Sequence, residues 1–183
     1  MLRLLEGKEK LTPHPNKIEL IRGLIGGTIS IYFLIYLSHT TDYLWIMAPF
    51  GASCVILYAA AQSPLAQPRN IIFGHIISAF IGLFFLKNFG STEWSIALSV
   101  GLSIFIMQYL RCVHPPAGAN PLVILLTAPH INYSWDFLLF PVLSGAVVLV
   151  SIAYIVNNTL SPKKWPIYCL ALFNTATQYT KKK

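Results

Sequence analysis

The sequence predicts an all-α integral membrane protein, and three observations support this fold class. Of the 183 residues, 55% are hydrophobic and only 10% are charged, whereas a soluble domain usually carries about 25% charged residues. Two shorter apolar segments are each interrupted by proline and glycine. Four longer apolar runs contain no Asp, Glu, Lys or Arg: 24–38, 71–86, 94–110 and 137–156. Runs of this kind, with their flanking residues, can cross a hydrocarbon core of about 30 Å as helices.

In chain order, the sequence predicts four full-length transmembrane helices and two short interrupted ones. The segment 43–61 is interrupted by Pro49 and Gly51, and the segment 113–128 has only 16 residues and three prolines. Either short segment can cross the bilayer or re-enter on the same side. The six predicted segments are 18–38, 43–61, 70–87, 93–111, 113–128 and 135–157.

The distribution of basic residues favours six crossings. If the N-terminus is cytoplasmic, 12 of the 13 Lys and Arg residues lie on or near the inner face, and only Lys87 lies outside. Re-entrant short segments would instead move Arg69 and Arg111 outside. The net charge of +7 therefore reports membrane topology rather than nucleic-acid binding. We expect a cytoplasmic N-terminal segment (1–17), a transmembrane domain (18–157) and a basic, cytoplasmic C-terminal tail (158–183).

A shift of 67 residues superimposes the two interrupted segments, 49–61 on 116–128. Pro49 falls on Pro116, Gly51 on Gly118, Ala52 on Ala119 and Ser53 on Asn120. Each unit (about 18–87 and 93–157) contains three spans, so the second must be inverted relative to the first. A 3+3 inverted repeat with interrupted helices is typical of transporters. The alternative is a chance match, because small residues are common where membrane helices touch.

The interrupted segments predict two half-helices that begin near the bilayer midplane. Asn120 is a favoured N-cap and Pro121 suits the first helical position, so we expect a half-helix over 121–128 after an extended piece. Ser53 would cap a second half-helix over 54–61. Two facing N-termini offer unpaired N–H groups and partial positive charge, which suit a small anion. The alternative is a proline kink that only packs.

Two histidines lie within the predicted spans, where ionisable groups are functional candidates. His114, near Arg111 at the predicted cytoplasmic mouth, is expected to attract an anion, shuttle a proton or cap a backbone carbonyl. For His75 we expect a hydrogen bond between helices. Arg69 and Arg111 either form a basic vestibule or only extend their charged ends to the membrane surface by snorkelling. Glu19 and Arg22, three residues apart on a helix, are expected to pair.

The pattern disfavours other classes of protein. The spans contain no carboxylate and no Cys–His pair at a plausible spacing, so we expect no enzyme, and a sensor lacks a soluble output domain. Cys54, Cys112 and Cys169 lie far apart and predict neither a metal site nor a disulfide framework. No cofactor is expected. The expected partners are a small anion and the lipid bilayer, and a homo-oligomer is left open.

The stretches "VHPPAGANP" (113–121) and "PFGASCVILYAAAQSPLAQPRNIIFGHIISA" (49–79) resemble the two signature stretches of the HPP family of integral membrane proteins. The family is named for the His-Pro-Pro motif, here His114, Pro115 and Pro116, and is usually described with four spanning helices. Chloroplast and cyanobacterial members are associated with nitrite transport, so the resemblance implies nitrite or a similar anion. Some members carry a C-terminal CBS-type domain, for which the tail here is too short.

From these observations we expect a transporter in a bacterial cell (inner) membrane, because no plastid transit peptide is evident. A passive, aquaporin-like channel is the alternative, since such pores also bring two half-helix N-termini together. The substrate is expected to contact both interrupted segments and their neighbours: Pro49, Gly51, Ala52, Ser53, His75, Arg111, His114, Pro115, Pro116, Gly118, Ala119 and Asn120.

Overall fold

The computed structural model describes residues 14–41, 43 and 45–168, and this part of the chain is helical with no strand. This confirms the all-α class. Short 3₁₀ helices η2 (Pro64–Ala66), η3 (Pro115–Ala119) and η4 (Trp135–Leu138) and a π-helical turn η5 (Leu139–Leu143) join the longer elements. Those are α1 (Lys17–Thr40), α2 (Ala48–Ala59), α3 (Pro68–Phe89), α4 (Glu93–Tyr109), α5 (Asn120–Thr127) and α6 (Ser144–Asn158).

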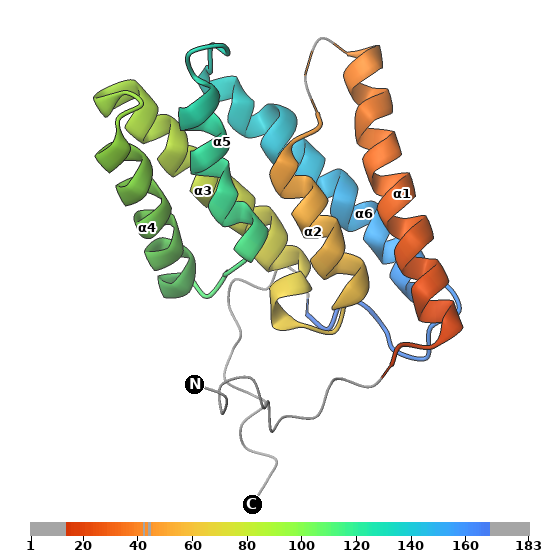
Figure 1. The fold of residues 1–183 in the computed structure, drawn as a ribbon. Helices are drawn as coiled ribbons and strands as arrows, with labels where there is room; N and C mark the ends of the chain where they lie inside the picture. Colours follow the sequence, from red (N-terminus) through yellow and green to blue (C-terminus); the bar gives the residue numbers. More distant parts are fainter. Residues whose placement is uncertain (1–13, 42, 44, 169–183) are drawn as a thin grey trace, which may run out of the picture.

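The six α-helices run alternately up and down the bundle in Figure 1. Lys17 at the start of α1 and Asn158 at the end of α6 lie at one end, together with η2 and the turn before η3. The end of α1, the start of α2 and the connection 128–134 lie at the opposite end. Each short segment therefore joins opposite ends of the bundle instead of returning to its own end.

Three helical stretches are long and apolar enough to span a membrane: Lys17–Thr40, Pro68–Phe89 and Trp135–Asn158. The prediction of four full-length helices differs at α4, which has 17 residues and reaches only about 26 Å. The helix α2 has 12 residues and reaches about 18 Å, well short of the hydrocarbon core. The last span is itself interrupted at Phe140, whose φ of −130° and ψ of 113° are not helical.

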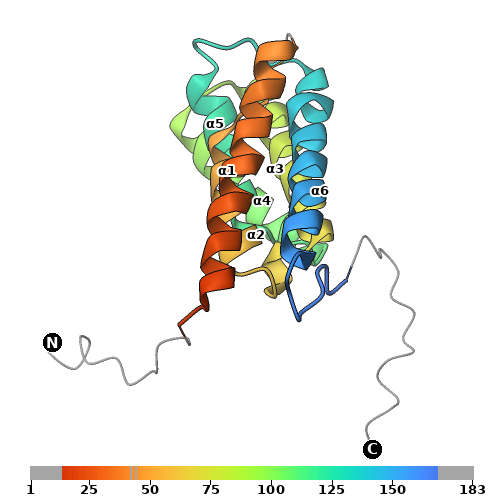
Figure 2. The ribbon, with the colours of Figure 1, turned by 90° about the vertical axis from the view of Figure 1, so that its right-hand side faces the viewer.

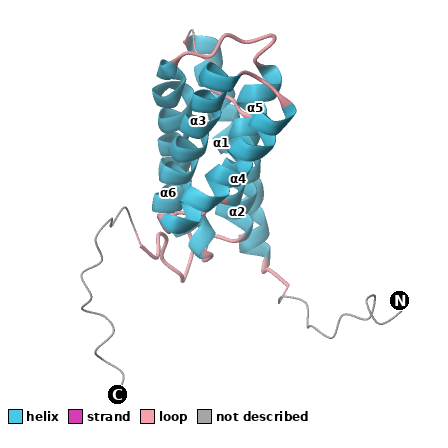
Figure 3. Cartoon of the chain, turned by 90° about the vertical axis from the view of Figure 1, so that its left-hand side faces the viewer, coloured by secondary structure: helices cyan, strands magenta, loops and turns pink. Residues whose placement is uncertain are grey.

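The helices form two neighbouring groups that share one apolar core. The helix α1 packs on α2 and α6, whereas α3 packs on α4 and α5. Figures 2 and 3 show the first and second group in front, respectively. Leu34, Phe50, Leu149 and Ile124 belong to the shared core, so the contact between the groups is tightly packed. Large apolar side chains such as Leu24 and Ile155 face outward, as expected for a surface in lipid.

After α6 the chain folds back against η2, and we call residues 165–168 the C-terminal strap. The backbone N–H of Trp165 donates to Oδ1 of Asn158, and the N–H of Ile167 donates to Oε1 of Gln67. The Tyr168 hydroxyl lies 3.0 Å from both the Pro64 carbonyl oxygen and Oδ1 of Asn70, and it can donate its one hydrogen to either. Burial raises the pKa of this hydroxyl, so it stays protonated and keeps donating at neutral pH. Residues 165–168 of the predicted tail are thus hydrogen-bonded to the helical domain.

Candidate functional site

A cluster of buried polar side chains lies where the two short segments meet α3. Ser53 comes from α2, His75 and Ser78 from α3, His114 from the turn before η3, and Asn120 from α5. All five have no exposed surface. Burying polar groups is costly unless they are hydrogen-bonded, so this concentration in an apolar bundle marks the site as special. We call these five residues the histidine cluster.

The Ser53 hydroxyl lies at the centre of the histidine cluster. Its Oγ is 2.9 Å from Nε2 of His75 and 2.8 Å from Nε2 of His114. It is also 3.0 Å from the Pro49 carbonyl oxygen, one turn earlier in α2. The two imidazole rings lie 5.2 Å apart, centroid to centroid. One hydroxyl therefore bridges both imidazoles, which accounts for the expected helix-to-helix hydrogen bond of His75.

The outer nitrogens of the two rings determine the direction of these hydrogen bonds. Nδ1 of His114 is 2.8 Å from the Leu65 carbonyl, which can only accept, so this nitrogen carries the hydrogen. Nδ1 of His75 is 3.1 Å from Nδ2 of Asn120, which can only donate, so this nitrogen is the acceptor. With both rings neutral, His75 Nε2–H donates to Ser53, and Ser53 donates to Nε2 of His114. The result is one directed chain from Asn120 to Leu65.

Asn120 anchors this chain to α3 and leaves one acceptor unused. Its Nδ2 has two hydrogens and three acceptors within reach, because the His75 carbonyl at 3.1 Å and Oγ of Ser78 at 2.9 Å lie beside Nδ1 of His75. Its Oδ1 is buried and has no hydrogen-bond donor among the described residues. A buried acceptor without a partner costs about 1–3 kcal/mol. This oxygen therefore favours a ligand or water that offers a hydrogen.

The predicted N-caps are wrong. The helix α2 begins at Ala48 with Met47 as its N-cap, because Pro49 suits the first turn. Ser53 therefore lies inside the helix, where its hydroxyl bonds the carbonyl four residues earlier and the two imidazoles. Asn120 has helical angles, and its side chain bonds α3 in place of a cap. The half-helix itself is present as α5 (Asn120–Thr127), close to the predicted 121–128.

The predicted pair of free helix N-termini is also wrong on the side of η3. A 3₁₀ helix occupies residues 115–119, where an extended piece was predicted. Pro115 and Pro116 have no N–H, and the Ala117 N–H donates to the His114 carbonyl. The N–H of Asn120 donates in turn to the Ala117 carbonyl. The start of η3 thus has few free backbone N–H groups for an anion.

The structure brings Ser53, His75, His114 and Asn120 together and separates other predicted site residues from them. Ala52, Pro115 and Arg111 are exposed, whereas Pro49 and Pro116 are buried and Ala119 is half-buried. An added Cβ at Gly51 or at Gly118 would have no heavy atom within 4 Å, so both glycines border open space. His114 was expected near Arg111 at the mouth, but it lies fully buried in the cluster.

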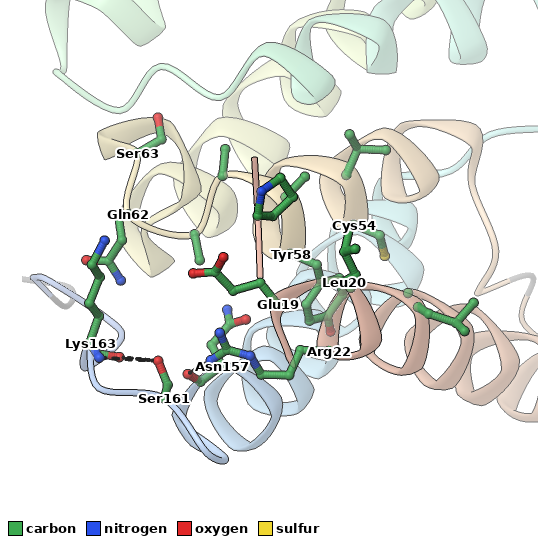
Figure 4. Close-up of a pocket in the computed structure, with 18 of the residues that line it drawn as sticks. Glu19, Leu20, Arg22, Cys54, Tyr58, Gln62, Ser63, Asn157, Ser161 and Lys163 are labelled. Carbon is green, nitrogen blue, oxygen red and sulfur yellow. Dashed lines mark hydrogen bonds between the residues drawn. The ribbon is translucent and has the colours of Figure 1, made fainter. Parts of the chain in front are cut away.

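A cavity of about 1020 Å³ lies between α1, α2 and the end of α6 (Figure 4). Its basic lining residues are Arg22 and Lys163 in place of the predicted Arg69 and Arg111. Arg22 donates from Nη1 to the Asn157 carbonyl at 3.2 Å, and its Nε is buried without a partner in the described chain. Gly51 also lines the cavity, which therefore extends to within two residues of Ser53 along α2.

The predicted Glu19–Arg22 pair is wrong, because each side chain has another partner. The Glu19 carboxylate accepts the backbone N–H of Asn16 at 2.9 Å and completes a capping box at the start of α1. Arg22 as a cavity residue and Ser78 as a cluster residue were not predicted from the sequence. An arginine in the second turn of an apolar helix was the available signal for Arg22, whereas nothing distinguished Ser78 from other helical serines.

Comparison with known proteins gives one family and two relatives. A family model described as the HPP transmembrane region matches residues 12–166. A transmembrane protein of Dictyostelium discoideum is 33% identical over 172 residues, which cover 88% of this chain and 60% of that protein. A second transmembrane protein of the same organism is 35% identical over 129 residues, or 68% of this chain and 42% of that protein. No solved structure matches the chain.

Proposed function

The chain belongs to the HPP transmembrane family, and from this premise we propose that it transports a small monovalent anion, with nitrite as the first candidate. The observation that carries the proposal is the histidine cluster. Three helices and the turn before η3 converge on a buried polar site in a membrane bundle, and Oδ1 of Asn120 has no donor among the described residues. Buried polar groups at membrane depth are rare and mark sites where polar species pass.

The burial of the cluster supports a carrier over a passive channel. Ser53, His75, His114 and Asn120 have no exposed surface, so in this conformation the cluster is closed to both ends of the bundle. A channel would need a wet path through it. A carrier instead opens the site to one side at a time, and the cavity beside Gly51 is the candidate route from the end that carries Arg22 and Lys163.

We also propose that the fold is a 3+3 inverted repeat, and the element boundaries support this. The helix α3 begins at Pro68 and η4 begins at Trp135, 67 residues later. The same shift moves α2 onto 115–126, which is the stretch formed by η3 and α5. The bundle end that holds Lys17, Arg69 and Lys163 is the proposed cytoplasmic face, because basic residues gather on that side.

The proposal is tested by nitrite uptake into proteoliposomes. We expect the purified protein to transport nitrite faster than protein-free liposomes do, with chloride, nitrate and formate as comparison anions. His75→Gln should lower uptake at least tenfold, because it removes the donor to Ser53 and the acceptor for Asn120. His130→Gln, an exposed histidine outside the cluster, is the matched control and should transport like the parent. Uptake by the parent no faster than in empty liposomes would refute the proposal for nitrite.

A further inference from the structure

We infer that the anion crosses together with one proton, which binds to Nε2 of His114 while the Ser53 hydroxyl turns from His114 to the Pro49 carbonyl. This inference rests on the proposed function and adds the coupling ion. It follows from a simple count of hydrogens and acceptors around Ser53. The hydroxyl has one hydrogen, and two acceptors compete for it: Nε2 of His114 at 2.8 Å and the Pro49 carbonyl at 3.0 Å.

In the neutral state every group of the bridge has a partner. Nε2–H of His75 donates to Oγ of Ser53, and the Ser53 hydroxyl donates to Nε2 of His114. Nδ1–H of His114 donates to the Leu65 carbonyl. The Pro49 carbonyl does not need the hydroxyl in this state, because it is free to accept the backbone N–H of the helix. The second acceptor is therefore available when the first is lost.

In the protonated state every group again has a partner. The arriving proton forms an N–H bond at Nε2 of His114, using the lone pair that previously accepted from Ser53. The hydroxyl hydrogen stays on Ser53 and rotates to the Pro49 carbonyl, which is already within 3.0 Å. Oγ of Ser53 then accepts from both Nε2–H groups, which fills its two acceptor positions. One rotation about a side-chain bond converts the first state into the second, and no helix has to move.

The geometry assigns the proton to His114 and not to His75. The free lone pair of neutral His75 is on Nδ1, where Nδ2 of Asn120 points a hydrogen at 3.1 Å. Protonation of Nδ1 would point its new N–H at the N–H group of Asn120, so two donors would face each other. Rotating the Asn120 amide would not help, because it would bring Oδ1 against the His75 carbonyl oxygen, and both of these oxygens can only accept. The rings are 5.2 Å apart, so a proton on each would also repel the other.

The charge created on His114 has no carboxylate to balance it within the described residues. Glu19, Glu93 and Asp136 lie in the first turns of α1, α4 and η4. The elements packed around the ring bring Arg69 from α3, Cys112 from the turn before η3, Cys54 from α2 and the Tyr168 hydroxyl beside η2. None of these is an anion at neutral pH, and Arg69 is a cation.

A buried cation without a counter-charge is costly, so the protonated state binds a small anion as its partner. The unpartnered Oδ1 of Asn120 fits the same chemistry, because a bare anion would be repelled by this oxygen. A hydrogen supplied by the anion's hydration water or by the acid form satisfies it. Proton and anion thus bind and leave as a neutral pair, and the site returns to its starting state.

The first experiment measures nitrite and proton uptake in the same proteoliposomes that contain the full chain. With an inward proton gradient, we expect nitrite to accumulate above equilibrium, with one proton entering per nitrite after subtraction of the leak in empty liposomes. Nitrite uptake without accumulation and without proton uptake would overturn the coupling and leave the proposed transport intact. No protein-dependent nitrite uptake under any gradient would instead overturn the proposed function on which the coupling rests.

The second experiment tests the Ser53 hydroxyl. Ser53→Ala leaves Nε2 of His114 without a partner in either state, so gradient-driven accumulation should fall at least tenfold. Ser103→Ala is the matched control, because Ser103 is equally buried and its hydroxyl bonds only the Ser99 carbonyl within α4. Ser53→Thr keeps the hydroxyl and should restore coupling. A Ser53→Ala protein that accumulates nitrite with the parent's proton ratio would overturn the proposal.

A spectroscopic measurement keeps the inference testable even if the variants fold poorly. The nitrogen-15 NMR shifts of both imidazoles are recorded in lipid for the parent protein, with and without nitrite at mildly acidic pH. We expect the Nε2 signal of His114 to change from an acceptor to an N–H nitrogen when nitrite is added. His75 should remain neutral with its hydrogen on Nε2. A proton that appears on His75, or on neither ring, would contradict the assignment.

Discussion

At the scale of single residues, the histidine cluster is notable for its mixture of satisfied and unsatisfied groups. The side-chain nitrogens of His75 and His114 all have partners, yet Oδ1 of Asn120 has none in the described chain. A purely structural core would be expected to fill such an acceptor, because a buried polar group without a partner costs about 1–3 kcal/mol. Substitution of Asn120 therefore tests the structural and the functional role of the cluster together.

Asn120→Leu should reduce both stability and transport. The change removes the donors to the His75 carbonyl and to Ser78 and leaves Nδ1 of His75 without a partner. We expect a loss of about 1–3 kcal/mol in folding free energy. Nitrite uptake per inserted protein should fall at least tenfold. Thermal unfolding in detergent and uptake in proteoliposomes measure the two effects.

The control for Asn120→Leu is Asn88→Leu. Asn88 is exposed, and its Nδ2 donates only to the Phe84 carbonyl in its own helix. This variant should unfold and transport like the parent. If Asn120→Leu also transports like the parent, the histidine cluster is a structural feature and the transported species passes elsewhere.

The sequence predicted the membership of the site better than its geometry. Ser53, His75, His114 and Asn120 were all predicted, because polar residues are conspicuous in apolar segments. Their roles differed from the prediction, since the sequence placed Ser53 and Asn120 as helix caps. Serine and asparagine are favoured at caps, but both also bond to distant groups, and local patterns carry no information about partners 22 to 61 residues away.

At the scale of helices, close packing depends on glycines at crossings. A Cβ added to Gly82 of α3 would lie 2.9 Å from Cα of Pro121 in α5, and one added to Gly74 would lie 2.8 Å from Cβ of His114. Small residues at such crossings let membrane helices approach closely, which is the main source of their attraction in lipid. The position of α5, and thus of Asn120, is set by Gly82.

Gly82→Ala should therefore destabilise the contact between α3 and α5. The neighbouring atom is backbone and cannot move aside without shifting a helix, so we expect a loss of about 1–3 kcal/mol. Gly101→Ala in α4 is the control, because an added Cβ there has no heavy atom within 4 Å. That variant should be neutral or slightly stabilised by its better helix propensity. Equal melting temperatures for both variants in detergent would show that α5 does not rest on Gly82.

The apolar runs predicted the helices well and the interruptions poorly. The predicted segment 70–87 corresponds to α3 (Pro68–Phe89), and 135–157 corresponds to the stretch Trp135–Asn158. Near prolines the local pattern was ambiguous. Pro49 interrupts nothing, because it occupies the first turn of α2, and Pro115 and Pro116 begin a 3₁₀ helix. Proline is compatible with a helix start and with an interruption, so the sequence alone did not separate the two.

At the scale of the whole molecule, both short segments connect opposite ends of the bundle. Cysteines introduced at the exposed residues Gln62 and His130 should therefore react with a membrane-impermeant reagent from opposite sides, His130 from outside. The parent protein, in which Cys54 and Cys112 are buried, provides the background labelling. Labelling of both introduced cysteines from the same side would contradict six crossings and favour re-entrant segments.

The distribution of basic residues between the two ends of the bundle could be predicted from the sequence. Arg69, Arg111 and Lys163 lie at one end of the bundle and Lys87 lies at the other, as the counting of basic residues predicts. The cavity beside Gly51 was not predicted, because it is formed by residues from α1, α2 and the end of α6 that are distant in the chain. A void depends on how whole helices diverge, and no single segment specifies it.

The C-terminal strap connects the end of the described chain to the buried His114 through η2. The Tyr168 hydroxyl lies within hydrogen-bond distance of the Pro64 carbonyl. The carbonyl of Leu65, which follows Pro64 in η2, accepts from Nδ1 of His114. A force applied to the chain at residue 168 therefore reaches the buried imidazole through one helical turn.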